Sequence, residues 1–452
     1  MIGKSVPRVD AYEKVTGRAK FTDDLILNKC LVARVYHAKI GNGVVKFIDT
    51  SEAEALDGVV KVVTFKDVPN HCYPTPGHPW SVELAHQDVA DRNLLTGRVR
   101  YYGDDIAAVV AEDEVTASRA LKLIKVEYEE YPVVVSPKIS MRGTEHPIHL
   151  DKKDNILARS SFAIGDVDSA MEKAAVKLKR SYKTPIVQHC HIENNISYAY
   201  MEKGRVVVVS STQIPHIVRR IVGQALGIPW GQVRVIKPYV GGGFGNKQEV
   251  LYEPLNAFLT MQVGGRPVKI ELTREETFTN TRTRHSIEYD MEAGVDAEGH
   301  LLAKEMTTYS NQGAYASHGH AIAANGLTAS RLQYACPNIR GEAYTVYTNC
   351  PTAGAMRGYG IPQVCFATES FMDDIAYEIG MDPLEFRRKN LIHGYYEDAY
   401  LKPIAANTNG IFECLEKGAE YIHWDEKRKA YQNQTGDIRR GVGMALFSYK
   451  TG

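Results

Sequence analysis

The sequence of 452 residues is 44% hydrophobic and 24% charged, and its 54 basic and 54 acidic side chains give a formal net charge of zero. This composition is typical of a globular protein with two or three domains, and the absence of a basic surplus argues against nucleic acid as a main partner. No apolar run approaches the roughly 20 residues of a membrane span. Residues 1–8 also lack the apolar core of a signal peptide. We therefore expect a cytoplasmic protein with no membrane partner.

Seven cysteines are scattered along the chain, and none forms a Cys-x-x-Cys pair. An odd number without paired spacing is typical of reduced thiols. We expect that the chain holds no iron–sulfur cluster by itself.

Residues 1–135 are predicted to form a small α+β unit. Residues 59–65 and 106–111 are rich in branched apolar side chains, as strands are. From 113 to 124 the apolar residues keep helical spacing, and Asp113 is a suitable N-cap. Prolines favour a loop over 68–80, and a domain boundary is predicted near 135.

From 136 to about 392, strands and helices are predicted to alternate. Residues 214–227 form an amphipathic helix by their apolar spacing, and Gly227 ends it. Two further helices are expected at 369–379 and 383–390. The segment 440–449 has the pattern of a strand that opens a new sheet, with no partner strand after it. We therefore expect either an N-terminal part of a longer chain or a second polypeptide that supplies the remainder.

The stretch from 239 to 249 carries the most information. Its central loop consists of Gly241, Gly242, Gly243, Phe244 and Gly245. A predicted strand at 232–237 precedes this glycine loop and a predicted helix at 253–261 follows it, an arrangement that can present backbone N–H groups to an anion. A P-loop would need Gly and Ser or Thr where Asn246 and Gln248 stand, and a dinucleotide fingerprint also fails at Asn246. The alternative is a tight turn without a ligand.

Several segments occur together in one order. They are 14–24 (Lys-Val-Thr-Gly-Arg-Ala-Lys-Phe-Thr-Asp-Asp), 211–215 (Ser-Thr-Gln-Ile-Pro), the glycine loop, 313–317 (Gly-Ala-Tyr-Ala-Ser) and 355–360 (Ala-Met-Arg-Gly-Tyr-Gly). In this order and at this spacing they resemble the molybdenum-binding subunit of the xanthine dehydrogenase and aldehyde oxidase family, over nearly the whole chain. The resemblance is greatest to the separate molybdenum subunit of bacterial xanthine dehydrogenases.

The resemblance implies an α+β fold in three parts. Residues 1–135 would form an α/β hammerhead domain, and residues 136–392 the first molybdenum cofactor-binding domain, of mixed α/β structure. Residues 393–452 would be a linker and the incomplete start of a second such domain.

The resemblance also implies a set of residues around the cofactor, namely Gln213, Gly243, Phe244, Gly245 and Arg357. The Gln213 amide would donate to an oxygen on molybdenum, and the loop at Phe244 would pack against the metal with a backbone amide facing it. Arg357 would lie near the molybdenum centre. Each has a simpler alternative: a surface glutamine, a core phenylalanine and a structural salt bridge.

Three residues match positions that contact the substrate in the family: Gln248, Asn325 and Tyr359. Tyr359 would stack on a planar ring, although the family more often has Phe there. Xanthine-oxidising enzymes often have Glu at the position of Gln248 and Arg at that of Asn325. Since an amide supplies only a neutral hydrogen bond, the paired change implies a different purine orientation or a different heterocycle.

The implied activity is the hydroxylation of a purine, xanthine or hypoxanthine, with oxygen from water. The cofactor would be molybdenum–molybdopterin, with or without an added cytosine nucleotide. Electrons would pass to partner chains, a 2Fe–2S subunit and an FAD-binding subunit. Nicotinate or another N-heterocycle, oxidised by a naturally split molybdenum subunit, is the first alternative. An incomplete, inactive chain that binds no cofactor is the second.

No residue matches the family's catalytic glutamate, so no catalytic residue is predicted. Glu249 and Glu253 lie near the glycine loop in sequence but match no family position. The run from His189 to Glu193 lacks the spacing of a structural zinc site and is expected to support the cofactor pocket.

Overall fold

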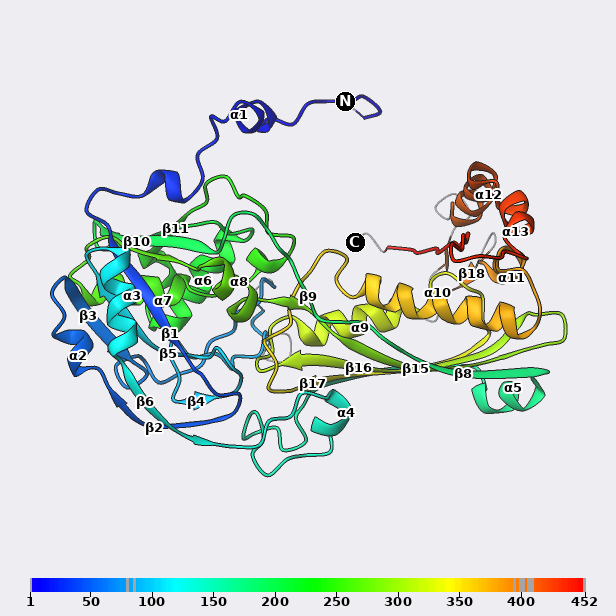
Figure 1. The fold of residues 1–452 in the computed structure, drawn as a ribbon, viewed down its shortest axis with the longest axis horizontal. Coiled ribbons are helices and arrows are strands. Elements are labelled where there is room, and N and C mark those ends of the chain that lie inside the picture. Colours follow the sequence, from blue (N-terminus) through cyan, green and yellow to red (C-terminus); the bar gives the residue numbers. More distant parts are fainter. Residues whose placement is uncertain are drawn as a thin grey trace.

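The computed structural model describes residues 2–78, 81–83, 87–392, 396–397, 403–404 and 410–449. They form two lobes side by side, one built on a seven-stranded sheet and the other on a five-stranded sheet (Figure 1). The N-terminal segment with α1 (Ala11–Val15) stands away from the first lobe, and α12 and α13 project from the second (Figure 1). Within the described ranges, no helix has the length and apolarity to cross a membrane.

The seven-stranded sheet of the first lobe has the order β12-β11-β10-β13-β1-β5-β3. Its strands are β1 (Leu31–His37), β3 (Val59–Thr64), β5 (Asp105–Ala111), β10 (Ile196–Glu202), β11 (Arg205–Ser210), β12 (Val233–Ile236) and β13 (Val268–Glu271). All seven residues of β5 are buried, and six of them form the continuous apolar run that predicted a strand at 106–111. A parallel pairing of β1 with β13 joins the chain before position 135 to the chain after it.

Helices cover this sheet and a small second sheet flanks it (Figure 1). The helices are α2 (Ser51–Glu54), α3 (Glu114–Leu123), α6 (Pro215–Leu226), α7 (Glu253–Gln262) and α8 (Arg274–Asn280), and the small sheet contains β2 (Gly43–Asp49), β4 (Arg98–Val99) and β6 (Lys125–Glu130). The predicted helices at 113–124, 214–227 and 253–261 are confirmed. Asp113 accepts from the Thr116 N–H as an N-cap, and Gly227 ends α6 with a φ of 67°.

The second lobe is a five-stranded sheet with α9 and α10 on one face and α4 and α5 on the other (Figure 1). Its strands, in sheet order, are β7 (Ile156–Ile164), β17 (Asn338–Tyr347), β16 (Leu301–Gly313), β15 (Ile287–Val295) and β8 (Val176–Lys183). Along β15 buried and partly exposed residues alternate, which turns Tyr289 and Met291 toward a core shared with α9 and α10. The helices are α4 (Pro137–Ser140), α5 (Val167–Lys173), α9 (Gly319–Ala329), α10 (Ile361–Glu378), α11 (Pro383–Asn390), α12 (Ile411–Ile422) and α13 (Trp424–Ala430).

Short elements complete the chain. They are the 3₁₀ turns η1 (Asp23–Leu25), η3 (Trp230–Gln232) and η4 (Asn246–Gln248), and the strand pairs β9 (Val187–Gln188) with β14 (Thr283–Arg284) and β18 (Tyr396–Glu397) with β19 (Pro403–Ile404). The loop expected at 68–80 is irregular as far as residue 78, with single bridges from Tyr73 to Arg92 and from Pro76 to Glu249; residues 79–80 lie outside the described ranges.

Two predicted elements differ from the structure. The helix expected at 369–379 begins earlier, at Ile361, because Gly360 precedes it with a φ of 94° and Pro362 is tolerated in a first turn. The strand predicted at 440–449 is wrong, since the segment pairs with no strand in the described chain. Instead, the Leu446 N–H donates to Glu369 Oε2 at 2.9 Å, and Val442 and Met444 pack against the core of the second lobe.

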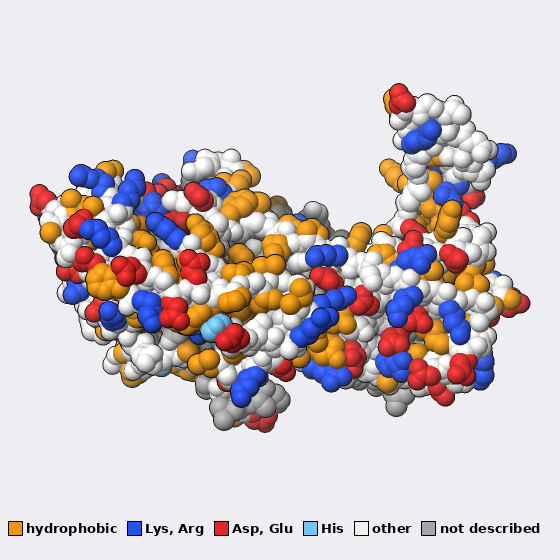
Figure 2. All heavy atoms as spheres, turned by 60° about the horizontal axis from the view of Figure 1, so that its bottom comes forward, with side chains coloured by type: hydrophobic (Ala, Val, Ile, Leu, Met, Phe, Trp, Pro, Cys, Tyr) orange, Lys and Arg blue, Asp and Glu red, His pale blue; other side chains and the backbone are white. Residues whose placement is uncertain are grey.

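The surface is mixed in charge. Figure 2 shows basic, acidic and hydrophobic side chains interspersed over one face of both lobes, without a broad field of one sign. This distribution agrees with the zero net charge.

A buried ion pair is expected to set the stability of the second lobe. Arg387, with no exposed side-chain surface, donates to Glu369 Oε2 at 3.0 Å and to Asp373 Oδ1 at 2.6 Å. The substitution Arg387→Met leaves Glu369 buried without its cation and should cost about 3–5 kcal/mol in urea unfolding. The neighbouring Arg388 is the matched control: it pairs with Glu416 and Glu385 at the surface, so Arg388→Met should cost about 1 kcal/mol or less. Equal losses of stability in the two variants would contradict the prediction that the buried Arg387–Glu369 pair stabilises the second lobe.

Candidate active site

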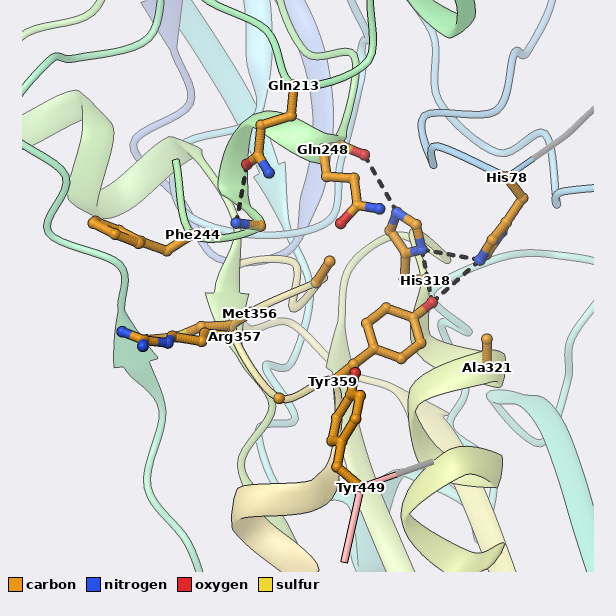
Figure 3. Close-up of a pocket in the computed structure, with 13 residues that line it drawn as sticks. His78, Gln213, Phe244, Gln248, His318, Ala321, Met356, Arg357, Tyr359 and Tyr449 are labelled. Atoms are coloured by element: carbon orange, nitrogen blue, oxygen red, sulfur yellow. Dashed lines mark hydrogen bonds between the residues drawn. The ribbon is translucent and has the colours of Figure 1, made fainter. Parts of the chain in front are cut away.

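A cavity of about 550 Å³ lies where the glycine loop, the loop before residue 78 and the start of α9 meet. Figure 3 shows its lining: His78, Gln213, Phe244, Gly245, Gln248, His318, Ala321, Ala355, Met356, Arg357, Gly358, Tyr359 and Tyr449. Phe244 and Arg357 point toward one side, and His78, His318 and the Tyr359 hydroxyl gather at the other (Figure 3). We call these the glycine-loop end and the histidine end.

The glycine loop reaches the cavity in a conformation that its sequence makes accessible. Phe244 has a φ of 52° and Gly245 a φ of 108°. A Cβ on Gly245 would lie 2.4 Å from the carbonyl oxygen of Ala355, so this position excludes side chains. The Arg357 N–H donates to the Phe244 carbonyl at 2.9 Å, which fixes the loop against the 355–360 segment.

Gln213 lies directly against this loop. Its Oε1 accepts from the Gly245 N–H at 3.0 Å, and its backbone N–H donates to the Lys247 carbonyl at 2.8 Å. A Cβ on Gly243 would come within 2.5 Å of the same Oε1, so Gly243 lies behind Gln213 and outside the cavity lining. With its oxygen occupied, the Gln213 amide keeps its N–H₂ group as a donor, and no partner for it is found in the described residues.

A buried ion pair supports the cavity from behind. Glu249 and Arg282 are paired at 2.5 Å, with 0% and 2% of their side chains exposed. Glu249 also accepts from Thr75 Oγ1 at 3.1 Å and from the Ser317 hydroxyl. Burial raises the pKa of Glu249, but the Arg282 guanidinium and these donors outweigh it and hold that pKa below its usual value. The carboxylate is therefore ionised and fully engaged, so it is not free to act as a general base.

The residues around His189 have structural contacts. His189 Nε2 lies 2.8 Å from the Ala355 carbonyl, and His191 Nδ1 lies 2.5 Å from that of Glu193. The Glu193 carboxylate pairs with the buried Lys247 at 2.7 Å and accepts from the Gly241 N–H at 2.7 Å. These contacts hold both ends of the glycine loop.

At the histidine end, hydrogen bonds connect Gly77, His318, Tyr359, His78 and Asp88. His318 makes two further close contacts, from Nδ1 to His78 Nε2 at 3.1 Å and from Nε2 to the Gln248 carbonyl at 3.4 Å. The Gly77 N–H donates to His318 Nε2 at 3.2 Å, so the Nδ1 of His318 carries the proton. This Nδ1–H donates to the Tyr359 hydroxyl at 2.8 Å, and the hydroxyl donates to His78 Nε2 at 3.2 Å. His78 Nδ1–H then donates to Asp88 at 2.5 Å. Burial lowers the pKa of His318 and raises that of Tyr359, so both stay neutral near pH 7.

The three predicted substrate residues are separated by the structure. Gln248 and Tyr359 line the cavity, while Asn325 does not. Asn325 Nδ2 donates to the Tyr359 carbonyl at 2.6 Å, from a smaller cavity of about 180 Å³ that shares Tyr359 and Tyr449. Its amide therefore holds the Tyr359 backbone, and its predicted contact with the substrate remains a prediction.

One group of side chains has the composition of a metal site. The ligand atoms of His78, Asp88 and His320 all lie within 4.8 Å of one another. However, Asp88 already accepts from His78, and Arg220 Nη2 lies 3.6 Å from its second oxygen. Since these groups balance the carboxylate charge, the arrangement is explained without a cation.

Sequence analysis did not find His78, His318 or Tyr449. His318 directly follows the 313–317 segment, which was a local signal for its position. His78 lies in a proline-rich loop and Tyr449 in the C-terminal tail, and nothing in the local pattern distinguishes either of them.

Comparison with known proteins identifies the family. A model of the molybdopterin cofactor-binding domain matches residues 148–391, more than half of the chain. A model of the a/b hammerhead domain of aldehyde oxidase and xanthine dehydrogenase matches residues 16–132. The chain belongs to the xanthine dehydrogenase and aldehyde oxidase family. The expected order of a hammerhead domain followed by a molybdenum cofactor-binding domain is thus confirmed. The family consists of oxidoreductases that are molybdenum hydroxylases.

Individual relatives differ in how much of their length the chain covers. The putative xanthine dehydrogenase molybdenum-binding subunit XdhA of Escherichia coli is 46% identical over 98% of the chain and 58% of its own length. The nicotinate dehydrogenase large molybdopterin subunit of Eubacterium barkeri is 32% identical over 93% of the chain and 96% of its own length. Among solved structures, quinoline 2-oxidoreductase from Pseudomonas putida 86 has a TM-score of 0.86 at 26% identity, covering 95% of the chain and 55% of that protein.

The glycine-loop end fits the family's molybdenum–pterin cofactor. Gln213 offers a neutral N–H donor, which can bond to an oxygen on the metal and cannot protonate it. The Phe244 ring is 48% exposed, and Arg357 is exposed without an ion pair in the described residues, so both are available to a bound group. The assignment of Gln213, Phe244, Gly245 and Arg357 to the cofactor remains a prediction from the resemblance.

The charge of Glu249 should make the stability of the first lobe pH-dependent. Because its pKa is depressed in the folded chain, its stabilisation is complete above the ordinary value of 4.5 and is lost as the pH falls through the lower folded value. The substitution Glu249→Gln leaves Arg282 buried without an anion and should cost about 3–5 kcal/mol at pH 7. Urea unfolding from pH 3 to 7 measures both effects, and the variant should lose the acid dependence.

Glu253 provides a control of opposite sign. Burial raises its pKa, so its ionisation opposes folding and stability rises as the pH falls through the folded value. Glu253→Gln should remove that opposite slope. Equal slopes in the two variants would contradict the assignment of Glu249 as an ionised partner of Arg282.

Proposed function

We propose that this chain forms the N-terminal part of the molybdenum-binding moiety of a purine hydroxylase that oxidises xanthine or hypoxanthine. The observation that carries the proposal is one cavity that brings together the Gln213 amide, the glycine loop, Arg357 and the ring of Tyr359. A volume of about 550 Å³ suits a planar heterocycle of one or two rings. The 46% identity to the putative xanthine dehydrogenase subunit favours a purine.

In this proposal the two ends of the cavity have different tasks. When bound, the molybdenum–pterin group supplies a Lewis acid and an acceptor for two electrons at the glycine-loop end. Gln213 orients it through its free N–H₂ group, and the glycine loop excludes water by close packing on the 355–360 segment. Tyr359 presents its ring to the substrate, and Gln248 offers a neutral hydrogen bond. Electrons would leave through a 2Fe–2S subunit and an FAD-binding subunit.

A nicotinate-oxidising enzyme with a split molybdenum subunit is the second candidate. The observation that favours it is coverage: the chain spans about 96% of the nicotinate dehydrogenase large molybdopterin subunit but only about 58% of the xanthine dehydrogenase subunit. The two candidates share the cofactor and differ in substrate and in chain organisation.

The complex purified from its source tests these proposals together. The intact mass of the polypeptide with Gln213 and Arg357 should exceed 50.3 kDa for the purine enzyme. A mass of 50.3 kDa beside a second molybdenum-domain polypeptide would favour the split enzyme. Turnover of xanthine, hypoxanthine and nicotinate then identifies the substrate. A complex without molybdenum would contradict both candidates and would favour an inactive chain.

Gly243→Ala tests whether Gln213 holds the cofactor. The new Cβ would meet Gln213 Oε1 at 2.5 Å and must displace the amide. Removing one oriented donor should lower kcat by about tenfold or more, with molybdenum content measured in parallel. The control is Gly231→Ala, where a Cβ meets nothing within 4 Å and activity should be unchanged. Full activity in Gly243→Ala would contradict the proposal that Gln213 holds the cofactor.

A further inference from the structure

The cavity lining is asymmetric in charge. Of its thirteen residues in the described chain, Arg357, His78 and His318 can carry positive charge, and none is acidic. Arg357 points away from the histidine end (Figure 3). A heterocycle that gains negative charge at the histidine end therefore faces two imidazoles and a phenol.

Of the two imidazoles, only His78 is in direct contact with a carboxylate among the described residues. Its Nδ1 lies 2.5 Å from Asp88 Oδ1, and only 3% of the Asp88 side chain is exposed. The second oxygen of Asp88 is buried, and Arg220 Nη2 lies 3.6 Å from it. The contact between the two side chains fixes His78 Nδ1 on Asp88 and leaves His78 Nε2 facing the Tyr359 hydroxyl. His318 lacks such an anion in direct contact: its Nε2 lies near the Gly77 N–H and the Gln248 carbonyl, and its Nδ1 near the Tyr359 hydroxyl and His78 Nε2.

The protonation of His78 determines where the Tyr359 proton points. When His78 is neutral, its Nε2 accepts from the Tyr359 hydroxyl, so the hydroxyl proton is occupied and is not donated to a ligand. When His78 is charged, its Nε2–H and His318 Nδ1–H both donate to the Tyr359 oxygen. The hydroxyl proton then has no acceptor in the chain of hydrogen bonds and is free to turn toward the cavity.

We propose that His78, held by Asp88, is the charge-stabilising residue of the cavity, and that its protonation converts Tyr359 into a hydrogen-bond donor for an anionic heterocycle. This inference rests on the proposed function and names how its site meets negative charge. In this proposal His78 and Tyr359 together stabilise the negative charge that, by the family resemblance, an arginine at the position of Asn325 would stabilise. The Asn325 amide itself donates to the Tyr359 carbonyl.

Among the described residues, the titratable or charged groups near His78 come from four parts of the chain. Asp88 belongs to its own loop, His318 and His320 come from the start of α9, and Tyr359 comes from the 355–360 segment. Arg220 of α6 approaches Asp88 at 3.6 Å. Burial lowers the pKa of His320, so His320 adds no charge near pH 7.

The test measures binding in the complete complex from pH 5.5 to 8.5. Nicotinate and nicotinamide are a matched pair, one anionic and one neutral, and urate is an anionic purine. In the unaltered complex, affinity for both anions should rise as the pH falls, and nicotinamide should show no such rise. His78→Gln should weaken anion binding about tenfold at pH 6 and remove the pH dependence, because a charge-assisted hydrogen bond is lost. Nicotinamide binding should stay within about twofold.

Two variants separate the roles, and one serves as control. Tyr359→Phe should weaken anion binding while it keeps part of the pH dependence, because His78 can still charge. Asp88→Asn should move the pH dependence toward lower pH. His320→Gln changes a neighbouring ring, 5.7 Å from His78, that has no contact with Tyr359, and should change nothing.

A second measurement follows the imidazoles directly. With ¹⁵N-labelled histidine, the signals removed by His78→Gln should show that ring becoming charged between pH 5.5 and 8.5, while His318 stays in its Nδ1–H form. A His78 ring that stays neutral at every pH, or unchanged anion affinity in His78→Gln, would overturn the proposal. Binding of nicotinate without urate would contradict the purine assignment and leave the role of His78 supported. Binding of neither anion would overturn both.

Discussion

The arrangement of the site depends on one buried ion pair, Glu249 with Arg282. Through Thr75 and Ser317, this pair connects the loop before residue 78, the end of the glycine loop, the segment after α8 and the turn before α9. A Cβ on Gly354 would lie 2.2 Å from Glu249 Oε1, so the chain immediately before the 355–360 segment is also packed against it. A desolvated charge requires a compensating partner in a fixed place, and this requirement holds the walls of the cavity in register.

The sequence predicted those elements whose signal is local. The spacing of apolar residues was sufficient for α3 and α6, and the continuous apolar run was sufficient for β5. The pairing of β1 with β13 had no such signal, because it joins segments more than 200 positions apart. The alternating pattern of 440–449 misled because alternation describes one buried face, and a strand also needs a neighbour that pairs with it.

The same division applies to the candidate site. The glycine loop and Gln213 belong to short segments with family patterns, and the structure brings them together at one end of the cavity. Asn325 matched by position, yet its side chain faces the Tyr359 carbonyl, because the direction of a helical side chain is set by packing. His78 was not found because its contact with Tyr359 spans 281 positions and exists only in the folded chain.

Two aromatic residues show where the structure works against local preference. Phe244 and Tyr359 both have positive φ, at 52° and 46°, and they lie at opposite ends of the cavity. This conformation costs a side-chain-bearing residue about 1–2 kcal/mol, so surrounding contacts must fix it. The Arg357 N–H holds the carbonyl of Phe244, and Asn325 holds that of Tyr359. Neither ring is fully buried, so core packing alone does not explain why the strained backbone is kept. Because the two strained residues lie at opposite ends of one cavity, we connect the strain with the group that binds in that cavity.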